Sequence, residues 1–249
     1  MTLTPALLFV AAFAAGVQNA LAGGGSFITF PALLLAGMDA RAANITSTVA
    51  LFPGQVTTGI AGRRLVAGTS QLGFPALVGI SLGGGMLGAL LLLATPASFF
   101  ARLVPWLVLF ATSVFAWGSF GRRDTGDAVA RLGRVGAGFA QFGISIYGGY
   151  FGGGIGFLML AALTLAGMQV RAAAATKNVL AAVMNASAVA IFMFSRDVHW
   201  LEAGVVAVAA IGGGQVGAWL LRRVDERRLR IGVVLVGAAL TVGLFWRGG

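Results

Sequence analysis

The chain has 249 residues, of which 58% are hydrophobic and only 10% charged, and its mean hydropathy is +0.93. A soluble domain could not bury this much apolar surface, so the composition predicts an integral membrane protein. The sequence contains no cysteine, which excludes disulfides, iron–sulfur clusters and thiol catalysis. The formal net charge of +10 is expected to report membrane orientation rather than nucleic-acid binding.

The first half of the chain reads as membrane helices with one broken segment. A retained first helix is expected over 4–21, since no basic region or cleavage site precedes it. The run Gly23–Gly25 ends this helix, because glycine is a poor helix former. Residues 26–36 would span ~17 Å, about half of the hydrocarbon core, and so predict a half-helix or re-entrant element that Gly37 terminates. Further helices are expected over 41–61, with a kink at Pro53, over 74–94 and over 103–120.

The second half repeats the first. When the chain is shifted by 130 positions, 13 of the 24 residues in 23–46 are identical to those in 153–176, including a Leu-Ala-Gly-Met motif. We therefore expect a first transmembrane repeat over 1–121, a cytoplasmic connecting loop over 122–134 and a second repeat over 135–249. Helices of the second repeat are predicted over 135–151, 156–166, 172–194, 203–221 and 231–246.

The arginines predict how the halves sit in the membrane. If each half crosses an odd number of times, twelve arginines fall on one side and four on the other, which favours the first side as cytoplasmic. The predicted fold class is thus an all-α membrane protein of two inverted repeats. Each repeat has three or more transmembrane helices plus a broken half-helix, giving about eight to ten membrane segments. Such transporters place their site at the repeat interface near the midplane and work by alternating access.

The glycine runs are the first candidate binding residues. Each precedes a short helix, and a helix N-terminus exposes backbone N–H groups and roughly half a positive charge, which binds anions. The alternative role of the two glycine runs is close packing between helices. We predict this packing role for Gly83–Gly85 and Gly88 in the helix over 74–94. The candidate substrate-binding residues of the two runs are Gly23, Gly24, Gly25, Ser26, Gly153, Gly154 and Gly156.

Polar residues on the two third helices are the second set of candidates: Thr46, Ser47 and Gln55, and Thr176, Lys177, Asn178 and Asn185. They are uncharged or basic, which suits an anion, although interhelical hydrogen bonding is an alternative role. Lys177 is the only charge well inside an apolar run, which makes it a functional candidate. Its alternative is snorkelling toward the helix end.

Catalytic and metal chemistry find no support in the sequence. The single histidine, His199, is expected in an interfacial loop, and the seven carboxylates lie near helix ends or in loops. We therefore predict no catalytic residue, no metal and no cofactor. A membrane-embedded enzyme or an assembly protein without transport activity stays open as the alternative function.

The repeated pattern of glycine run, short apolar segment, Gly-Met, Arg-Ala-Ala and Thr resembles the sulfite exporter TauE/SafE family of membrane permeases. The stretch from Gly23 to Pro31 is similar to that family's first signature, whereas Ala161 replaces the proline in the second copy. The resemblance implies transport of a small sulfur-containing anion, such as sulfite, thiosulfate or a sulfonate, across the bacterial inner membrane. The residues themselves indicate only an anion. The predicted partners are a small inorganic or organosulfur anion, the lipid bilayer and coupled protons, and no nucleic acid.

Overall fold

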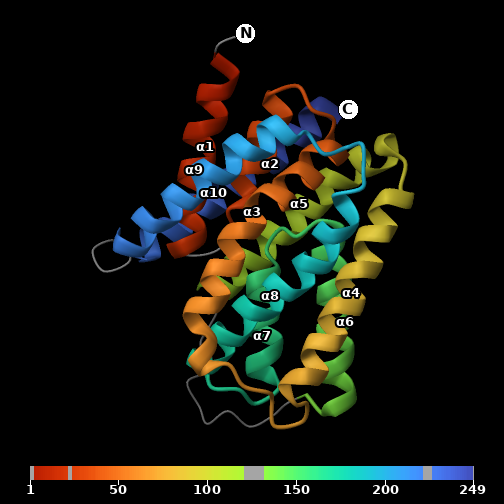
Figure 1. The fold of residues 1–249 in the computed structure, drawn as a ribbon, viewed down its shortest axis with the longest axis vertical. Coiled ribbons are helices and arrows are strands. Elements are labelled where there is room, and N and C mark those ends of the chain that lie inside the picture. The colour runs from red at the N-terminus through yellow and green to blue at the C-terminus, as the bar shows by residue number, and fades with distance from the viewer. Residues whose placement is uncertain (1–2, 22–23, 121–131, 221–225, 249) are drawn as a thin grey trace.

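The computed structural model describes residues 3–21, 24–120, 132–220 and 226–248, and within them the chain is all helical (Figure 1). The first half contains α1 (Leu3–Leu21), α2 (Ser26–Leu35), α3 (Ala40–Gly62), the 3₁₀ turn η1 (Arg63–Leu65), α4 (Phe74–Ala94) and α5 (Ala97–Phe120). The second half contains α6 (Arg134–Tyr150), α7 (Ile155–Leu165), α8 (Val170–Phe192), α9 (Trp200–Leu220) and α10 (Glu226–Gly248). The predicted all-α class is confirmed.

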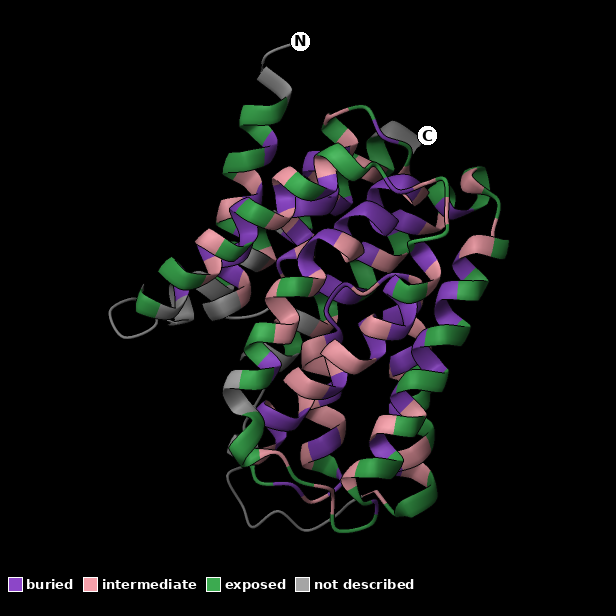
Figure 2. Cartoon of the chain, viewed as in Figure 1, coloured by how far each residue is buried: buried purple, intermediate pink, exposed green. Residues whose placement is uncertain are grey.

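Four of the described helices are long and apolar enough to cross a membrane, namely those in α4, α5, α8 and α9. Exposed leucines cover the outer side of α4, while its buried residues face the rest of the molecule (Figure 2). This distribution is the one expected where lipid rather than water surrounds a helix.

Most predicted boundaries lie within three residues of the observed ones, and α4 has the predicted limits. The start of α5 was predicted wrongly at 103, because the helix begins at Ala97, directly after Pro96. The predicted start lies directly after Arg102, a charged residue in this otherwise uncharged helix. Pro105 is buried inside α5, where packing against neighbouring helices can compensate for its missing hydrogen bond.

The Leu-Ala-Gly-Met motif ends both short helices in the same way. Gly37 has a φ of +94° and donates to the Leu34 carbonyl at 3.0 Å, while the next amide, that of Met38, donates to the Leu33 carbonyl at 3.2 Å. This is a Schellman cap, which needs glycine at the left-handed position. Gly167, with a φ of +88°, makes the equivalent cap on α7. The motif therefore recurs because the same helix stop is built twice.

Two ends of the molecule can be recognised in Figure 1. The upper end carries both chain termini and the start of α3, where Arg41 forms an ion pair with Asp197 at 3.0 Å and donates to the Thr95 carbonyl at 3.0 Å. At the lower end, the loop after η1 meets the α7–α8 turn through a hydrogen bond from the Ser70 hydroxyl to the Ala166 carbonyl.

Each half begins with two helices that enter and leave at the same end. Helix α6 starts beside the end of α7, where the Leu132 amide donates to the Leu165 carbonyl at 3.1 Å. Helix α1 descends from the upper end and α2 returns toward it (Figure 1). The chain therefore turns back between α1 and α2 and between α6 and α7, toward the end of the molecule from which it came, and we call these two turns re-entrant in that sense. Both re-entrant turns bring their glycine runs to the middle of the molecule.

Small residues let the first helix of one half pack closely on the fourth helix of the other. A Cβ on Gly84 or Gly88 of α4 would come within 3.0 Å of α6, and one on Gly213 of α9 would collide with the Phe13 carbonyl of α1. The helix-packing role predicted for the α4 glycines is confirmed at these positions, whereas Gly83 has no neighbour within 4 Å.

Candidate functional site

A cavity lies at the centre of the molecule, between α3, α8 and the two re-entrant turns. The volume of the cavity that the centres of water molecules can occupy is about 100 Å³. One water needs ~10–15 Å³ on this measure, so the cavity has room for several waters or one small hydrated anion. The residues that line it come from both halves of the chain: Asn19, Gly24, Gly25, Ser26, Ser47, Thr48, Leu51, Gln55, Thr58, Phe151, Gly152, Gly154, Ile155, Gly156, Phe157, Lys177, Asn178, Ala181 and Asn185.

Most of the candidate residues named from sequence meet in this cavity: Gly24, Gly25, Ser26, Ser47, Gln55, Gly154, Gly156, Lys177, Asn178 and Asn185. Gly153 instead lines a second, much smaller space of about 10 Å³, to which Ser26 also contributes. Gly23 lies outside the described residues. The duplication therefore gathers equivalent positions of the two halves, far apart in sequence, at one place.

Left-handed glycines turn the chain into both short helices. Gly24 has a φ of +81° and Gly154 a φ of +72°, a region that other residues enter only with strain. The Gln18 side chain steadies the first turn by donating to the Gly24 carbonyl at 3.0 Å. After each glycine, the first turn of a helix lines the cavity. The amides of Phe27 and Phe157 donate to the Gly24 and Gly154 carbonyls at 3.0 and 3.1 Å, so the amides just before them are the ones that the helix geometry leaves directed beyond the helix end. Two helix N-termini thus meet one cavity.

Lys177 places its amino group in the cavity. Its Nζ donates to Asn178 Oδ1 at 3.0 Å, and a Cβ built on Gly156 would lie 3.5 Å from it. The cation is therefore beside the first turn of α7 and directed into the cavity, which does not fit the snorkelling alternative. Among the described side chains that line the cavity, none is acidic.

Gln55 and Asn185 occupy equivalent positions, 130 residues apart, and bind each other. The Asn185 amide group donates to Gln55 Oε1 at 2.5 Å, joining α3 to α8. Equivalent positions of the two halves are therefore in direct contact beside the cavity. Near the same crossing, Gly59 of α3 packs on the α8 backbone at Val179.

Thr46 and Thr176 do not line the cavity, because their hydroxyls already bind loops. The Thr46 hydroxyl donates to the Asp197 carbonyl at 3.3 Å and accepts from the His199 amide at 3.2 Å, at the upper end. Thr176 binds both the amide and the carbonyl of Ala67, at 3.1 and 3.2 Å, at the lower end. Asp197 follows Ala67 by the same 130 positions, so each threonine holds the corresponding loop of the other half.

Several lining residues were not predicted from sequence, among them Asn19, Thr58 and Phe151. Asn19 is a polar residue in an otherwise apolar helix, a few positions before the glycine run, which is a signal that could have found it. Thr58 has no polar counterpart in the second half, because position 188 is a buried alanine. Phe151 packs edge-on against Phe30, with ring centroids 5.9 Å apart, and reads from sequence as core.

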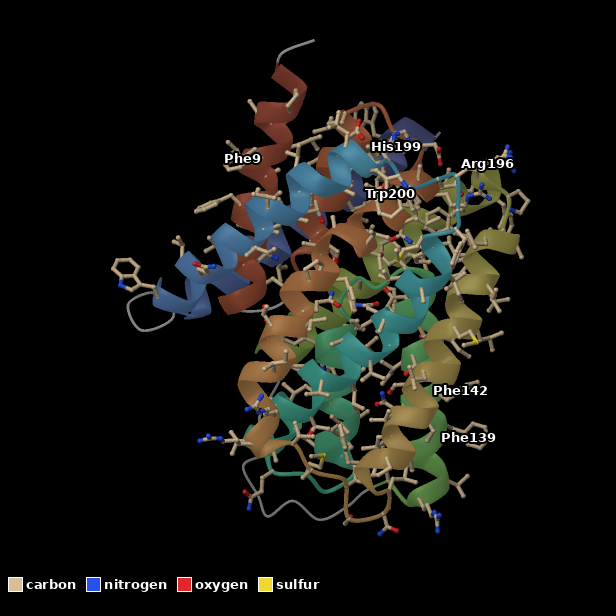
Figure 3. The ribbon with its side chains drawn as sticks, in the orientation of Figure 1. Phe9, Phe139, Phe142, Arg196, His199 and Trp200 are labelled. Carbon is tan, nitrogen blue, oxygen red and sulfur yellow. The ribbon has the colours of Figure 1, made fainter. Side chains whose placement is uncertain are left out.

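His199 lies at the upper end, next to Trp200 (Figure 3). It is exposed, and its Nδ1 lies 4.0 Å from Glu202. His199 thus lies in a loop, the one between α8 and α9, as expected from sequence. Within the described residues, no cluster of histidine and carboxylate side chains could hold a metal ion.

A family model and several relatives each match nearly the whole length of the chain. Residues 8–244 match the family model described as "Sulfite exporter TauE/SafE". The chain is 29% identical over 243 residues to the "Probable membrane transporter protein" of Haemophilus influenzae, which covers 97% of this chain and 94% of that protein. It is 32% identical over 246 residues to the "Probable membrane transporter protein ORF9" of a Sinorhizobium species, with 96% and 91% covered.

A third relative is the "Probable membrane transporter protein YfcA" of Escherichia coli K12, which is 27% identical over 246 residues, with 96% of this chain and 89% of that protein covered. The family match, over residues 8–244, extends through both halves and includes every residue that lines the cavity. The chain belongs to the sulfite exporter TauE/SafE family and is a multi-pass membrane transporter.

Proposed function

We propose that the chain is a permease that moves a small anion across the bacterial inner membrane, by alternating access to the central cavity. The observation that carries this proposal is the composition of the cavity. A lysine ammonium and two helix N-termini meet there, and the described lining side chains include no carboxylate. The family resemblance narrows the anion to a sulfur-containing one, namely sulfite, thiosulfate or a sulfonate.

Electrostatics favour an anion over a cation in this cavity. Each helix N-terminus contributes roughly half a positive charge, and the Lys177 ammonium adds one more. Hydrogen bonds between these donors and an ionised oxygen are worth about 1.5–3 kcal/mol each, more than bonds between neutral groups. We propose that the amides at Gly25–Ser26 and Ile155–Gly156, together with Lys177, Asn178 and Ser47, replace the water shell of the anion. Gln55 and Asn185, which bind each other and line the same cavity, would complete the site where the two halves meet.

Inversion of the two halves, 1–121 and 135–249, would supply the alternating access. The paired contacts support this proposal, because Gln55 meets Asn185 at the centre and the two threonines hold equivalent loops at opposite ends. Exposed arginines of η1 and the start of α6 lie at the lower end, which we propose to be cytoplasmic with the connecting loop 122–134.

The two ends of the cavity differ in this structure. Thr58, near the lower end of α3, is exposed and lines the cavity, whereas its counterpart Ala188 is fully buried in the apolar core. The upper end is further held by the Arg41–Asp197 ion pair. We propose that this is the state open toward the cytoplasm, and that the opposite state exchanges these contacts between the halves.

Purified protein in liposomes tests the proposed function. Uptake of labelled sulfite, thiosulfate and a sulfonate is expected to exceed that of sodium or choline, and Gly24→Val or Gly154→Val should abolish it in a folded protein. An enzyme would convert a substrate without moving it, and an assembly protein would do neither. Absence of anion uptake by well-folded protein under every imposed gradient would refute the proposal.

A further inference from the structure

Building on the proposed anion site, we infer that Lys177 is a proton carrier. It takes up one proton when the anion binds and releases it when the anion leaves, so the transporter moves H⁺ and the anion together. The inference depends on the proposed function for its anion but adds what accompanies that anion and what drives its movement.

The amino group of Lys177 is isolated from the other ionisable side chains that the structure describes. Lys177 is the only ionisable residue among the described side chains that line the cavity, and the hydrogen-bond partner of its Nζ is the neutral oxygen of Asn178. A lysine charge at the centre of a membrane helix costs at least ~3 kcal/mol. A bound anion offsets that cost by direct attraction, and the empty cavity holds no described carboxylate to do so. The proton and the anion are therefore bound cooperatively.

The elements packed on α8 and around the cavity direct no other described titratable group into it. Helices α1, α2, α4 and α7 have no charged side chain over their described lengths. The titratable groups of the remaining neighbours are turned elsewhere: Arg41 pairs with Asp197, the Tyr147 hydroxyl donates to the Leu107 carbonyl, and Tyr150 donates to Thr95. The other titratable residues on these elements, none of which lines the cavity, are Arg63, Arg64 and Arg134.

The second charged residue of α8, Arg171, belongs to its first turn, about six residues or ~9 Å before Lys177. An arginine stays protonated in proteins and so cannot exchange the proton. No described group near the cavity can therefore substitute for Lys177 as donor or acceptor of a proton. The duplication adds a contrast, since Ser47 holds the equivalent position in the first half and carries no charge.

The cycle balances in protons and charge. On one side of the membrane, water delivers H⁺ to the neutral amine of Lys177, and a monoanion binds beside the ammonium. On the other side, the anion leaves and the ammonium returns its proton to water. The empty protein then resets with a neutral amine. A permanently charged residue would instead remain as an uncompensated cation in the membrane interior each time the protein returns without an anion, at the cost given above.

Calorimetry on the wild-type protein is the decisive experiment. Isethionate, a monoanion, and thiosulfate, a dianion that would move with one net negative charge, are suitable probes, because the charge of each is constant over the working range of pH. Titrations at one pH in two buffers of different ionisation enthalpy count the protons taken up per anion bound, and the series is repeated from neutral to alkaline pH. We expect uptake that rises to one proton per anion, and in lightly buffered liposomes an anion uptake that alkalinises the outer solution.

Two variants of the same position separate charge from proton exchange. Lys177→Arg keeps a permanent cation, so it should bind anion without proton uptake and lose accumulation driven by an acid exterior. Lys177→Met should lower anion affinity about 10–100-fold, as expected for losing a hydrogen bond to a charged group. Arg134→Met is the matched control, because it removes an exposed cation outside the cavity and should leave proton uptake unchanged.

The outcomes also distinguish this inference from the proposed function. Anion binding and transport without proton uptake, or a Lys177→Arg protein that takes up as many protons as wild type, would overturn the inference and leave the anion permease standing. Failure of both probes to bind or move would overturn the two together. Thermal unfolding of each variant checks its folding, and the wild-type proton count decides the question even if a variant is unstable.

Discussion

Gly154→Ala tests whether the left-handed turn before α7 is needed for transport. Gly154 has a φ of +72°, where an alanine costs about 1–2 kcal/mol relative to its preferred conformations. The added Cβ would also lie 3.1 Å from the Ala111 carbonyl oxygen and 3.3 Å from the Ala111 Cβ, tighter than ordinary contact. The chain can relieve both by turning the start of α7, which moves its first amides away from the cavity.

We expect Gly154→Ala to lower stability by about 1–3 kcal/mol and anion uptake at least tenfold, since 1.4 kcal/mol of lost binding is already a factor of about ten. Gly83→Ala is the control, because Gly83 lies within α4 with no atom within 4 Å of a built Cβ. It should transport normally and be as stable as wild type or more so, since alanine is the better helix former. Uptake in liposomes and thermal unfolding measure both quantities. Normal uptake by a Gly154→Ala protein of unchanged stability would refute the reasoning.

Three further predictions concern topology and the paired contacts. Single cysteines replacing the exposed Arg64 and Arg196, in a chain with no cysteine of its own, should react with impermeant reagents from opposite faces of the membrane, and labelling from one face would contradict the proposed topology. Thr46→Val should cost about 1–3 kcal/mol in thermal unfolding, because it leaves a loop amide unpaired; an unchanged transition would show that water replaces the hydroxyl. Gln55→Leu and Asn185→Leu should be non-additive by about 0.6–1.7 kcal/mol in a double-mutant cycle, whereas additive losses would argue against a direct bond in the membrane.

The helices and the broken segments were predictable because local chemistry determines them. Gly37 and Gly167 end their helices because glycine adopts the left-handed conformation easily. The apolar run of α4 is bounded by Gly73 before it and Thr95 after it, and the helix has the same limits. Pro105 lies inside α5, where the missing hydrogen bond of a proline is tolerated once neighbouring helices surround it. That compensation is a tertiary effect and leaves no local signal.

The internal duplication made some of the cavity residues predictable, namely those that occupy equivalent positions in the two halves. Equivalent polar positions such as Gln55 and Asn185 could be paired by counting, and they do meet. Thr46 and Thr176 could be paired in the same way, yet counting could not show that each hydroxyl is already bound by a loop of the other half. Thr58 lies in the cavity because the two ends differ in this structure, a property that a symmetric sequence comparison cannot contain.

Locating a bound anion is the most direct test of the central claim. Crystals or reconstituted particles would be prepared with selenite, a heavier analogue of sulfite whose selenium can be located by anomalous scattering. The account predicts one strong peak in the cavity, within hydrogen-bond distance of Lys177 Nζ and of the first-turn amides of α2 and α7, and loss of that peak in Lys177→Met. A peak only at exposed arginines such as Arg63 and Arg64, from a protein that transports selenite, would contradict the account.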